Sequence, residues 1–248
     1  MCGRYTLKTP APKLIELFHT PQFPDLTPRY NIAPTQRVLV IRIDPENKRQ
    51  ALLARWGLIP FWAKDVSIGA RMINARSETV SEKPAFRQAW KKRRCLIPAD
   101  GFFEWETVAP RQKQPWLIHM NDELPFAMAG LWECWRIPTD QNGTLSGSPP
   151  VPSSHGMSST GGNNPNGETD SMLISCTILT TQANDDVRPL HDRMPVILQP
   201  HQYECWLNED SSNQQRLDLL QPLPNGSMSR RAVSTAINKV GNEVDFDA

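Results

Sequence analysis

The stretch that decides the fold class is Arg37-Val-Leu-Val-Ile-Arg-Ile43, followed by Asp44-Pro-Glu-Asn-Lys48 and Arg49-Gln-Ala-Leu-Leu-Ala-Arg-Trp56. The two outer segments are rich in aliphatic and β-branched residues, which favour strands. The five residues between them are polar and include Pro and Asn, which is typical of a turn. Residues 37–56 are therefore predicted to form two β-strands joined by a turn.

More short strands are predicted beyond this pair, and only a few helices accompany them. The predicted strands are Arg94–Pro98, Gly101–Glu106, Trp116–Met120, Phe126–Trp132, Leu173–Thr180 and a closing strand Arg231–Ile237. The predicted helices are Pro12–His19 with Leu14, Leu17 and Phe18 on one face, one from Pro84 through Trp90, and one opened by Pro200 that carries Tyr203, Trp206 and Leu207. This order predicts an α+β fold, a single domain around a mainly antiparallel, curved, barrel-like sheet with short flanking helices.

Residues 137–171 interrupt the pattern with a stretch rich in Ser, Gly, Pro and Asn. The stretch has almost no large apolar side chains and cannot bury enough surface to offset the entropy of ordering it. A disordered surface insertion is favoured over a linker between two domains, because each flank alone is too interrupted to look complete. We expect one domain over residues 2–237, whose two parts share a sheet, and a short acidic tail over 238–248.

Composition limits the class of partner and the compartment. The net charge of the 248 residues is only +1, so any nucleic-acid site must be local. Five Cys without a CxxC pair indicate neither a disulfide framework nor a zinc site. The sequence has neither a signal-peptide pattern nor an apolar run of membrane-spanning length. We expect a cytoplasmic monomer that is not secreted, does not enter a membrane and keeps its thiols reduced.

Cys2 is the first candidate for chemistry, because its small side chain allows Met aminopeptidases to remove Met1. Removal would leave an α-amine and a thiol on one residue, with ordinary pKa values of about 7.7–8.0 and about 8.5. With an aldehyde, the amine can form an imine that the thiol closes into a thiazolidine. With an amide or ester, the thiol can attack while the amine serves as base. Taken alone, Cys2 is also explained simply as a small residue.

Two loop segments carry groups that could contact a ligand. Asn31-Ile-Ala-Pro-Thr35 is an extended turn before a strand and, alone, is ordinary turn chemistry. In Arg55-Trp-Gly-Leu-Ile-Pro-Phe-Trp62, two Trp flank a loop broken by Gly and Pro. Such rings can stack on unpaired bases, worth about 1–3 kcal/mol each. Without other evidence, the favoured interpretation is that they plug the end of a sheet.

Charged and amide groups gather in two further segments. Asn74-Ala-Arg-Ser-Glu78, preceded by Arg71, combines an amide that can orient a reacting oxygen with guanidinium groups suited to phosphate. The same residues would also fit a helix N-terminus with surface charge. Lys91-Lys-Arg-Arg94 ends a predicted helix, where interaction with the helix C-terminus is favoured over phosphate contact.

A strand and a loop supply candidate acid–base groups. Glu104 and Glu106 lie in a strand rich in Phe and Trp, and strand alternation puts both on one face, so periodicity does not choose between them. Burial against aromatic rings would raise a carboxyl pKa toward the range useful for general acid–base catalysis. His191 lies beside Asp192 and Arg193 in a non-helical loop, and a purely structural role for it is equally open.

Six motifs follow one another in the order of a known family. They are Met-Cys-Gly-Arg (1–4), Asn-Ile-Ala-Pro (31–34), Trp-Gly-Leu-Ile-Pro (56–60), Asn-Ala-Arg-Ser-Glu (74–78), Cys-Leu-Ile-Pro-Ala-Asp-Gly-Phe-Phe-Glu-Trp (95–105) and His-Asp-Arg-Met-Pro (191–195). Together they closely resemble the SOS-response-associated peptidase (SRAP) family, the abasic-site processing proteins. The resemblance runs from Cys2 to about Ile237, and the insertion 137–171 departs from it.

The resemblance implies a protein that binds single-stranded DNA, often at a junction with duplex, and recognises abasic sites. The mature N-terminal Cys2 would condense with the C1′ aldehyde of the opened sugar to a thiazolidine, a crosslink that shields the lesion. Asn74 would hold the N-terminus and the sugar, Glu104 would shuttle protons, and His191 would assist proton transfer and reversal. Met1 would be removed partly by autoproteolysis. The resemblance also implies SOS induction and association with the nucleoid on DNA damage. It implies no metal, nucleotide or flavin.

Eight residues are candidates for DNA contact. They are Arg4, Asn31, Pro34, Trp56, Trp62, Arg71, Arg76 and Arg87. The resemblance itself implies this role for Arg4, Arg76, Trp56 and Trp62. Arg4 and Arg76 would grip phosphates that flank the lesion, and which of the two Trp stacks on a base stays open.

Other functions fit part of the pattern. Glutamine amidotransferases of the N-terminal-nucleophile type also open with Met-Cys-Gly, but there an apolar strand follows, whereas Arg4-Tyr-Thr6 here leads into a short helix. A non-catalytic reader of modified or single-stranded DNA would bind DNA equally well without Cys2. A peptidase that acts on other proteins is a third alternative.

Overall fold

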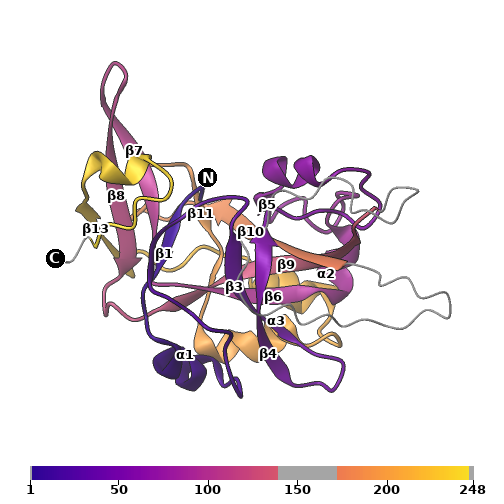
Figure 1. Ribbon diagram of the computed structural model, residues 1–248. Helices are drawn as coiled ribbons and strands as arrows, with labels where there is room; N and C mark the ends of the chain where they lie inside the picture. The colour runs from indigo at the N-terminus through magenta and orange to yellow at the C-terminus, as the bar shows by residue number, and fades with distance from the viewer. Residues whose placement is uncertain (1, 139–171, 246–248) are drawn as a thin grey trace.

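A five-stranded barrel lies at the centre of the computed structural model, which describes residues 2–138 and 172–245 (Figure 1). Its strands are β3 (Arg37–Ile43), β4 (Arg49–Trp56), β6 (Arg94–Ala99), β9 (Phe126–Arg136) and β10 (Met172–Gln182). The pairing runs from β10 through β4, β3, β6 and β9 and returns to β10. Every pair is antiparallel except β10 with β4. The ring of pairs confirms the expected barrel-like, mainly antiparallel sheet.

The two strands that flank the insertion pair directly with each other. Residues Gly130–Arg136 of β9 lie opposite Met172–Ile178 of β10. The parts of the chain before and after the insertion therefore share a sheet, as expected. The predicted disorder of 137–171 concerns residues of which nearly all lie outside the described ranges.

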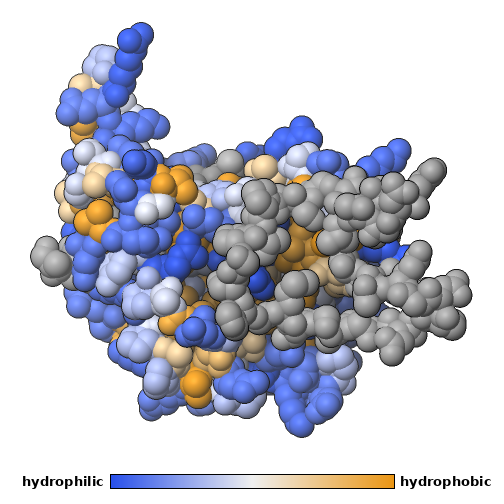
Figure 2. Space-filling view, viewed as in Figure 1, coloured by the Kyte–Doolittle hydropathy of each residue, from blue (hydrophilic) through white to orange (hydrophobic). Residues whose placement is uncertain are grey.

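A second, smaller sheet carries the N-terminal strand. Its order is β13 (Met228–Ala232), β8 (Gln112–Met120), β7 (Gly101–Ala109), β1 (Tyr5–Leu7) and β2 (Arg29–Ile32). All its pairs are antiparallel. The β7–β8 hairpin extends away from the rest of the molecule, and its tip is strongly hydrophilic (Figures 1 and 2). Three short strands extend the barrel sheet: β5 (Asn74–Arg76), β11 (Arg193–Pro195) and β12 (Ile197–Leu198).

Short helices cover the barrel. They are α1 (Ala11–Phe18), α2 (Arg87–Lys92), α3 (Tyr203–Leu207) and α4 (Asn213–Asp218), with 3-10 turns η1 (Val66–Arg71), η2 (Pro200–Gln202) and η3 (Thr235–Asn238). Aromatic rings join them: Phe18 stacks on Tyr203 at 5.5 Å between ring centroids, and Trp90 meets Trp206 edge-on at 5.8 Å. No helix among the described residues is long and apolar enough to cross a membrane.

Several sequence predictions are confirmed, and two are wrong in detail. The strands Arg37–Ile43 and Arg49–Trp56 have the predicted bounds, and the helices near 12–19 and 200–207 are present. Helix α2, however, begins at Arg87, because the chain around Pro84 forms turns closed by Phe86 N–H to Lys83 O at 2.9 Å. At its end, Arg94 Nη1 donates to the carbonyl oxygens of Trp90 and Lys91, both at 2.8 Å, as the helix C-terminus interpretation expects.

The predicted closing strand 231–237 is the second error. The strand is Met228–Ala232, and Val233 N–H then bonds Pro115 O at 3.1 Å. The Ser234 side chain accepts from Ala236 N–H at 3.2 Å and caps the 3-10 turn η3, which ends extended pairing. Strand alternation in the sequence does not reveal this cap, because Ser, Thr and Ala are all compatible with a strand edge.

Candidate functional site

Pairing of the first strand places Cys2 beside Glu104. In the β1–β7 pair, Tyr5 lies opposite Phe102, and Phe103 N–H donates to Arg4 O at 2.9 Å. The same antiparallel register, continued by one residue, puts Glu104 opposite Gly3. The Glu104 charge is close enough to contribute to the raised pKa of the Cys2 thiol. The first residues are thus held against the middle of β7 by ordinary sheet hydrogen bonds.

Asn74 fixes Cys2 from the barrel side. Strand β5 pairs in parallel with β10, with Asn74 opposite Ile178, and the Asn74 side-chain amide donates to Cys2 O at 2.8 Å. Asn74 Oδ1 is buried and has no hydrogen-bond partner among the described residues. Cys2 is fully buried, and this burial raises the pKa of its thiol to about 12. The thiol is therefore protonated at neutral pH.

Glu104 differs from Glu106, although the two share a face of β7. Glu104 is 5% exposed, and burial raises the pKa of its carboxyl group to about 7. Glu106 lies farther along the hairpin and accepts a hydrogen bond from Trp116 Nε1 at 2.9 Å. Burial, rather than strand alternation, therefore separates the two, and the carboxyl group of Glu104 is suited to give and take protons near neutral pH.

His191 lines the same cleft as Glu104 and has a neutral ring. Its Nδ1 is 2.9 Å from Arg193 N and 2.8 Å from Asp192 Oδ1. One nitrogen cannot accept from the amide and donate to the carboxylate at once. Burial lowers the pKa of His191, and the Asp192 side chain is 86% exposed to water, so acceptance from Arg193 N–H prevails. The proton of the neutral ring is then on Nε2.

Glu104 and His191 line an open cleft of about 570 Å³. Its lining residues are Arg4, Glu104, Trp105, Arg111, Lys113, His191 and Asn238. Cys2 does not line the cleft and lies buried behind Glu104. Three cationic side chains face one carboxyl group, so the cleft favours an anionic ligand.

Four of the lining residues were not predicted from the sequence. Trp105 follows Glu104 on β7, Arg111 and Lys113 lie at the β7–β8 hairpin, and Asn238 ends the 3-10 turn η3. Two cations just beyond a candidate carboxylate strand were a usable signal for Arg111 and Lys113. The sequence gives no such signal for Asn238, because only the tertiary fold brings the C-terminal segment to this cleft.

The residues expected to contact DNA fall into two groups. Trp62 is 49% exposed, Pro34 is half-buried, and three arginines are exposed: Arg71, Arg76 and Arg87. Arg76 lies two residues after Asn74 on β5, so the two side chains leave the strand on the same side. Arg4 is half-buried and lines the cleft.

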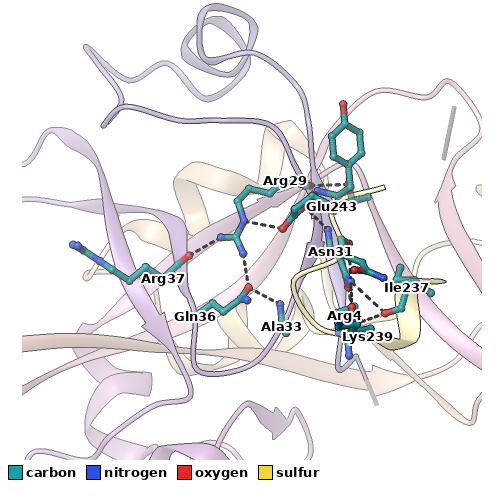
Figure 3. A network of polar contacts seen from close by, with 12 residues as sticks. Arg4, Arg29, Asn31, Ala33, Gln36, Arg37, Ile237, Lys239 and Glu243 are labelled. Carbon is teal, nitrogen blue, oxygen red and sulfur yellow. Dashed lines mark hydrogen bonds and ion pairs between the residues drawn. The ribbon is translucent and has the colours of Figure 1, made fainter. Parts of the chain in front are cut away.

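Trp56 and Asn31 are fully buried, which corrects the expectation that they contact DNA directly. Trp56 Nε1 donates to Ile73 O at 2.9 Å, and its ring meets Tyr5 edge-on at 5.3 Å between centroids. It packs in the core at the end of β4, in line with the interpretation that the residues alone favoured, in which the ring plugs the end of a sheet. The Asn31 side chain is bonded to the C-terminal segment and to Arg4 (Figure 3).

The fold and the cleft define an α+β barrel protein whose second residue is a cysteine held between an amide and a protonatable carboxyl group. Residues 1–240 match the model of the family described as SOS response associated peptidase (SRAP). The chain belongs to this family.

Named relatives and solved structures are similar over nearly the whole chain. Abasic site processing protein YoqW of Bacillus subtilis is 40% identical over 98% of this chain and 96% of its own length. Abasic site processing protein HMCES of Xenopus tropicalis is 28% identical over 87% of this chain and 64% of its own. A crystal structure of a protein from Bacteroides thetaiotaomicron superimposes with a TM-score of 0.75 at 25% identity, over 96% of this chain and 95% of that one.

Proposed function

We propose that this protein processes abasic sites in single-stranded DNA, and that Cys2, once freed of Met1, forms a thiazolidine with the opened sugar. The observation that carries the proposal is the burial of Cys2 beside Asn74 and Glu104, where Glu104 lines a cleft that also holds Arg4, Arg111 and Lys113. The relatives named abasic site processing proteins, such as YoqW, support an abasic site as the lesion that this protein processes. A metal or cofactor is not needed for this condensation.

The condensation releases one water molecule in total. The Cys2 amine adds to the C1′ aldehyde, and loss of water leaves an imine. The sulfur then bonds to the same carbon, and the ring nitrogen ends with the proton that the thiol gave up. Because burial keeps the thiol protonated, the amine reacts first. Glu104, with a pKa of about 7, can remove the thiol proton and return it to nitrogen.

Two neighbouring groups would orient the reactants. Asn74 holds the Cys2 carbonyl oxygen, and its second amide atom, Oδ1, is left to accept a hydrogen bond from the freed amine. His191 would donate from Nε2 to an oxygen of the opened sugar, since its Nδ1 is committed to Arg193 N–H. We propose that the same groups assist reversal of the crosslink and partial autoproteolytic removal of Met1, with Glu104 as the proton carrier.

The cations around the cleft would guide the DNA backbone. Arg4, Arg111 and Lys113 flank the reactive centre, and Arg76 lies beside Asn74. We extend the phosphate-contact assignment to Arg71 and Arg87. Trp62, rather than Trp56, would stack on an unpaired base, and Pro34 would border the strand. We also propose that the protein binds single-stranded DNA at junctions with duplex, acts as a monomer and associates with the nucleoid after DNA damage.

The test is a crosslinking reaction on single-stranded DNA that contains one uracil and is treated with uracil-DNA glycosylase. Protein without Met1 should give a heat-stable adduct, and its intact mass should rise by the abasic oligonucleotide minus one water. The Cys2→Ala variant should give none. The absence of any adduct from fully processed protein, with intact binding to the same strand, would leave a non-catalytic DNA reader in its place.

A further inference from the structure

A C-terminal clasp, residues 235–243, contributes Asn238 to the lining of the cleft. Figure 3 shows its contacts with Asn31 and Arg4. The clasp follows the edge strand β13 and crosses to β2 on the opposite edge of the smaller sheet. Ile237 is fully buried in a cluster with Phe103, Leu117 and Val233. Because Phe103 and Leu117 belong to β7 and β8, the clasp is packed directly on the sheet that carries Glu104.

One buried side chain holds the clasp. Asn31 Nδ2 donates to three backbone oxygens of the clasp, those of Ile237 at 3.2 Å and of Lys239 and Asn242 at 3.0 Å each. The backbone N–H of Asn31 donates to Glu243 Oε2 at 3.1 Å. An amide is suited to this position, because its nitrogen donates to the clasp while its oxygen remains available on the other side.

That oxygen fixes Arg4. Arg4 Nη1 donates to Asn31 Oδ1 at 2.6 Å and to Ile237 O at 2.8 Å, so the guanidinium is bonded to the clasp and to its anchor at once. The guanidinium also lies 5.7 Å from the centre of the Trp105 ring. Trp105 Nε1 in turn donates to Asn238 Oδ1 of the clasp at 2.7 Å. Arg4, Trp105 and Asn238 all line the cleft.

We infer that Asn31 is a positioning residue. Through the clasp, it holds Arg4 and Asn238 at the positions where they line the cleft for the incoming DNA strand. The inference rests on the proposed function, in which Arg4 binds a phosphate next to the lesion. The groups that react with the aldehyde are held elsewhere, by β1, β5 and β7. Release of the clasp should therefore weaken capture of the DNA and leave the chemistry at Cys2 unchanged.

The variant that separates the two bonds of Asn31 is Asn31→Asp. An aspartate keeps an acceptor for Arg4 but has no N–H for the clasp, and it turns an oxygen toward three carbonyl oxygens. The matched control is Asn121→Asp at the other end of the sheet, where Asn121 Nδ2 donates to Gly226 O at 2.7 Å and Oδ1 accepts from Ser229 Oγ. That position is exposed and lies outside the cleft.

Three readouts test the inference on full-length protein without Met1. Hydrogen exchange should become faster over residues 235–243 in Asn31→Asp. The concentration of abasic single-stranded DNA at half-maximal crosslinking rate should rise about tenfold, with the maximal rate within about twofold of the parent. The rate of adduct formation with free 2-deoxyribose, followed by intact mass, should stay unchanged. The control should match the parent in all three.

The outcomes separate this inference from the proposed function. A loosened clasp with an unchanged half-maximal DNA concentration would overturn the inference, as would equal slowing with DNA and with 2-deoxyribose. If the parent itself gives no adduct, the proposed function fails, and binding of unmodified single-stranded DNA by anisotropy still reports whether the clasp matters. Should Asn31→Asp not unfold cooperatively, Glu243→Ala loosens the same clasp from the solvent side and must reproduce the effect.

Discussion

The side-chain amide of Asn74 donates to the carbonyl oxygen of Cys2 across 2.8 Å, and this bond joins the N-terminal strand to the barrel. The two residues are 72 positions apart in the sequence: Cys2 precedes β1 of the smaller sheet, and Asn74 lies in β5 of the barrel sheet. Under the proposed function Cys2 reacts through its own α-amine, so that amine cannot also be the group that holds it. Restraint through the carbonyl group would leave both the amine and the thiol available to react once Met1 is gone.

The first prediction follows from this bond. Asn74→Ala should slow the single-turnover crosslinking rate by about 10- to 100-fold, because a misplacement of about 1 Å at a reacting group can cost about 10²-fold. The melting temperature should change little. A matched control is Asn225→Ala, which removes an exposed bond to Asp185 away from the cleft and should keep the parent rate. Equal rates for Asn74→Ala and the parent would refute the positioning role.

The second prediction concerns the pH dependence of stability at Glu104. Its pKa is about 7 in the folded protein against an ordinary 4.5, so the folded state keeps a proton that the unfolded state has lost. Stability from this group is therefore full below pH 4.5 and declines as the pH rises to 7. Glu104→Gln should be more stable than the parent by about 3 kcal/mol at pH 8 and equal to it near pH 4.

Urea unfolding of both proteins at the two pH values measures this difference. The same variant should lose crosslinking activity at every pH, which marks a residue that costs stability for the sake of function. A stability difference that does not depend on pH would contradict the raised pKa.

Local pattern is enough to predict the strand pair Arg37–Trp56, the helix near Pro12 and the β-rich order of the chain. From the sequence, the sheet is predicted to be curved, but the strand pairs that close the barrel are not predicted. Closure depends on β10, which pairs with β9 on one side and with β4 and β5 on the other. Parallel pairing between distant strands leaves no local trace in a sequence. Asn74–Arg76 shows the effect, since the residues also fit a helix start and form a strand.

The groups proposed to react are identified by the resemblance to a family and not by periodicity. The structure brings Cys2, Asn74 and Glu104 together and places His191 on the same cleft. Alternation does not distinguish Glu104 from Glu106, because the difference between them is burial, a tertiary property. Asn31 looks like a surface turn residue in the sequence for the same reason: its partners arrive from more than 200 positions away.

The third prediction tests the cations of the β7–β8 hairpin. Replacement of both Arg111 and Lys113 by Gln should weaken binding of unmodified single-stranded DNA. It should also lower the slope of log affinity against log salt by about 0.7 for each phosphate that the protein no longer neutralises. Lys48→Gln, at an exposed turn cation paired with Glu46, is the control and should leave the slope unchanged. Identical slopes for hairpin variant and parent would exclude these cations from the DNA path.

The fourth prediction contrasts the two Trp that flank one loop, Trp56 at the end of β4 and Trp62. Trp62→Ala should weaken single-stranded DNA binding by about 1–3 kcal/mol, the usual value of a stacked base, with no change in melting temperature. Trp56→Phe should instead lower the melting temperature, because a smaller phenyl ring leaves part of the buried indole volume empty and cannot make the bond to Ile73 O. DNA titrations and thermal unfolding of both variants decide the matter. A reversal of these two effects would mean that the core and surface roles are misassigned.

The fifth prediction concerns Gly57, which follows the buried Trp56 with φ +123 and touches Gly69 of η1. A Cβ on Gly57 would lie 2.5 Å from Gly69 O, so Gly57→Ala must push the loop of Trp62 away from η1. Beyond the strain of about 1–3 kcal/mol at such a φ, this clash should lower both stability and DNA affinity. Gly226→Ala is the matched control, since Gly226 has φ +78 and open space around its Cβ position. The Gly226→Ala variant should carry the backbone strain alone. Thermal unfolding and DNA titration should therefore show a larger loss of stability and of DNA affinity for Gly57→Ala. Equal losses for the two variants would show that the Gly57–Gly69 contact does not position the loop.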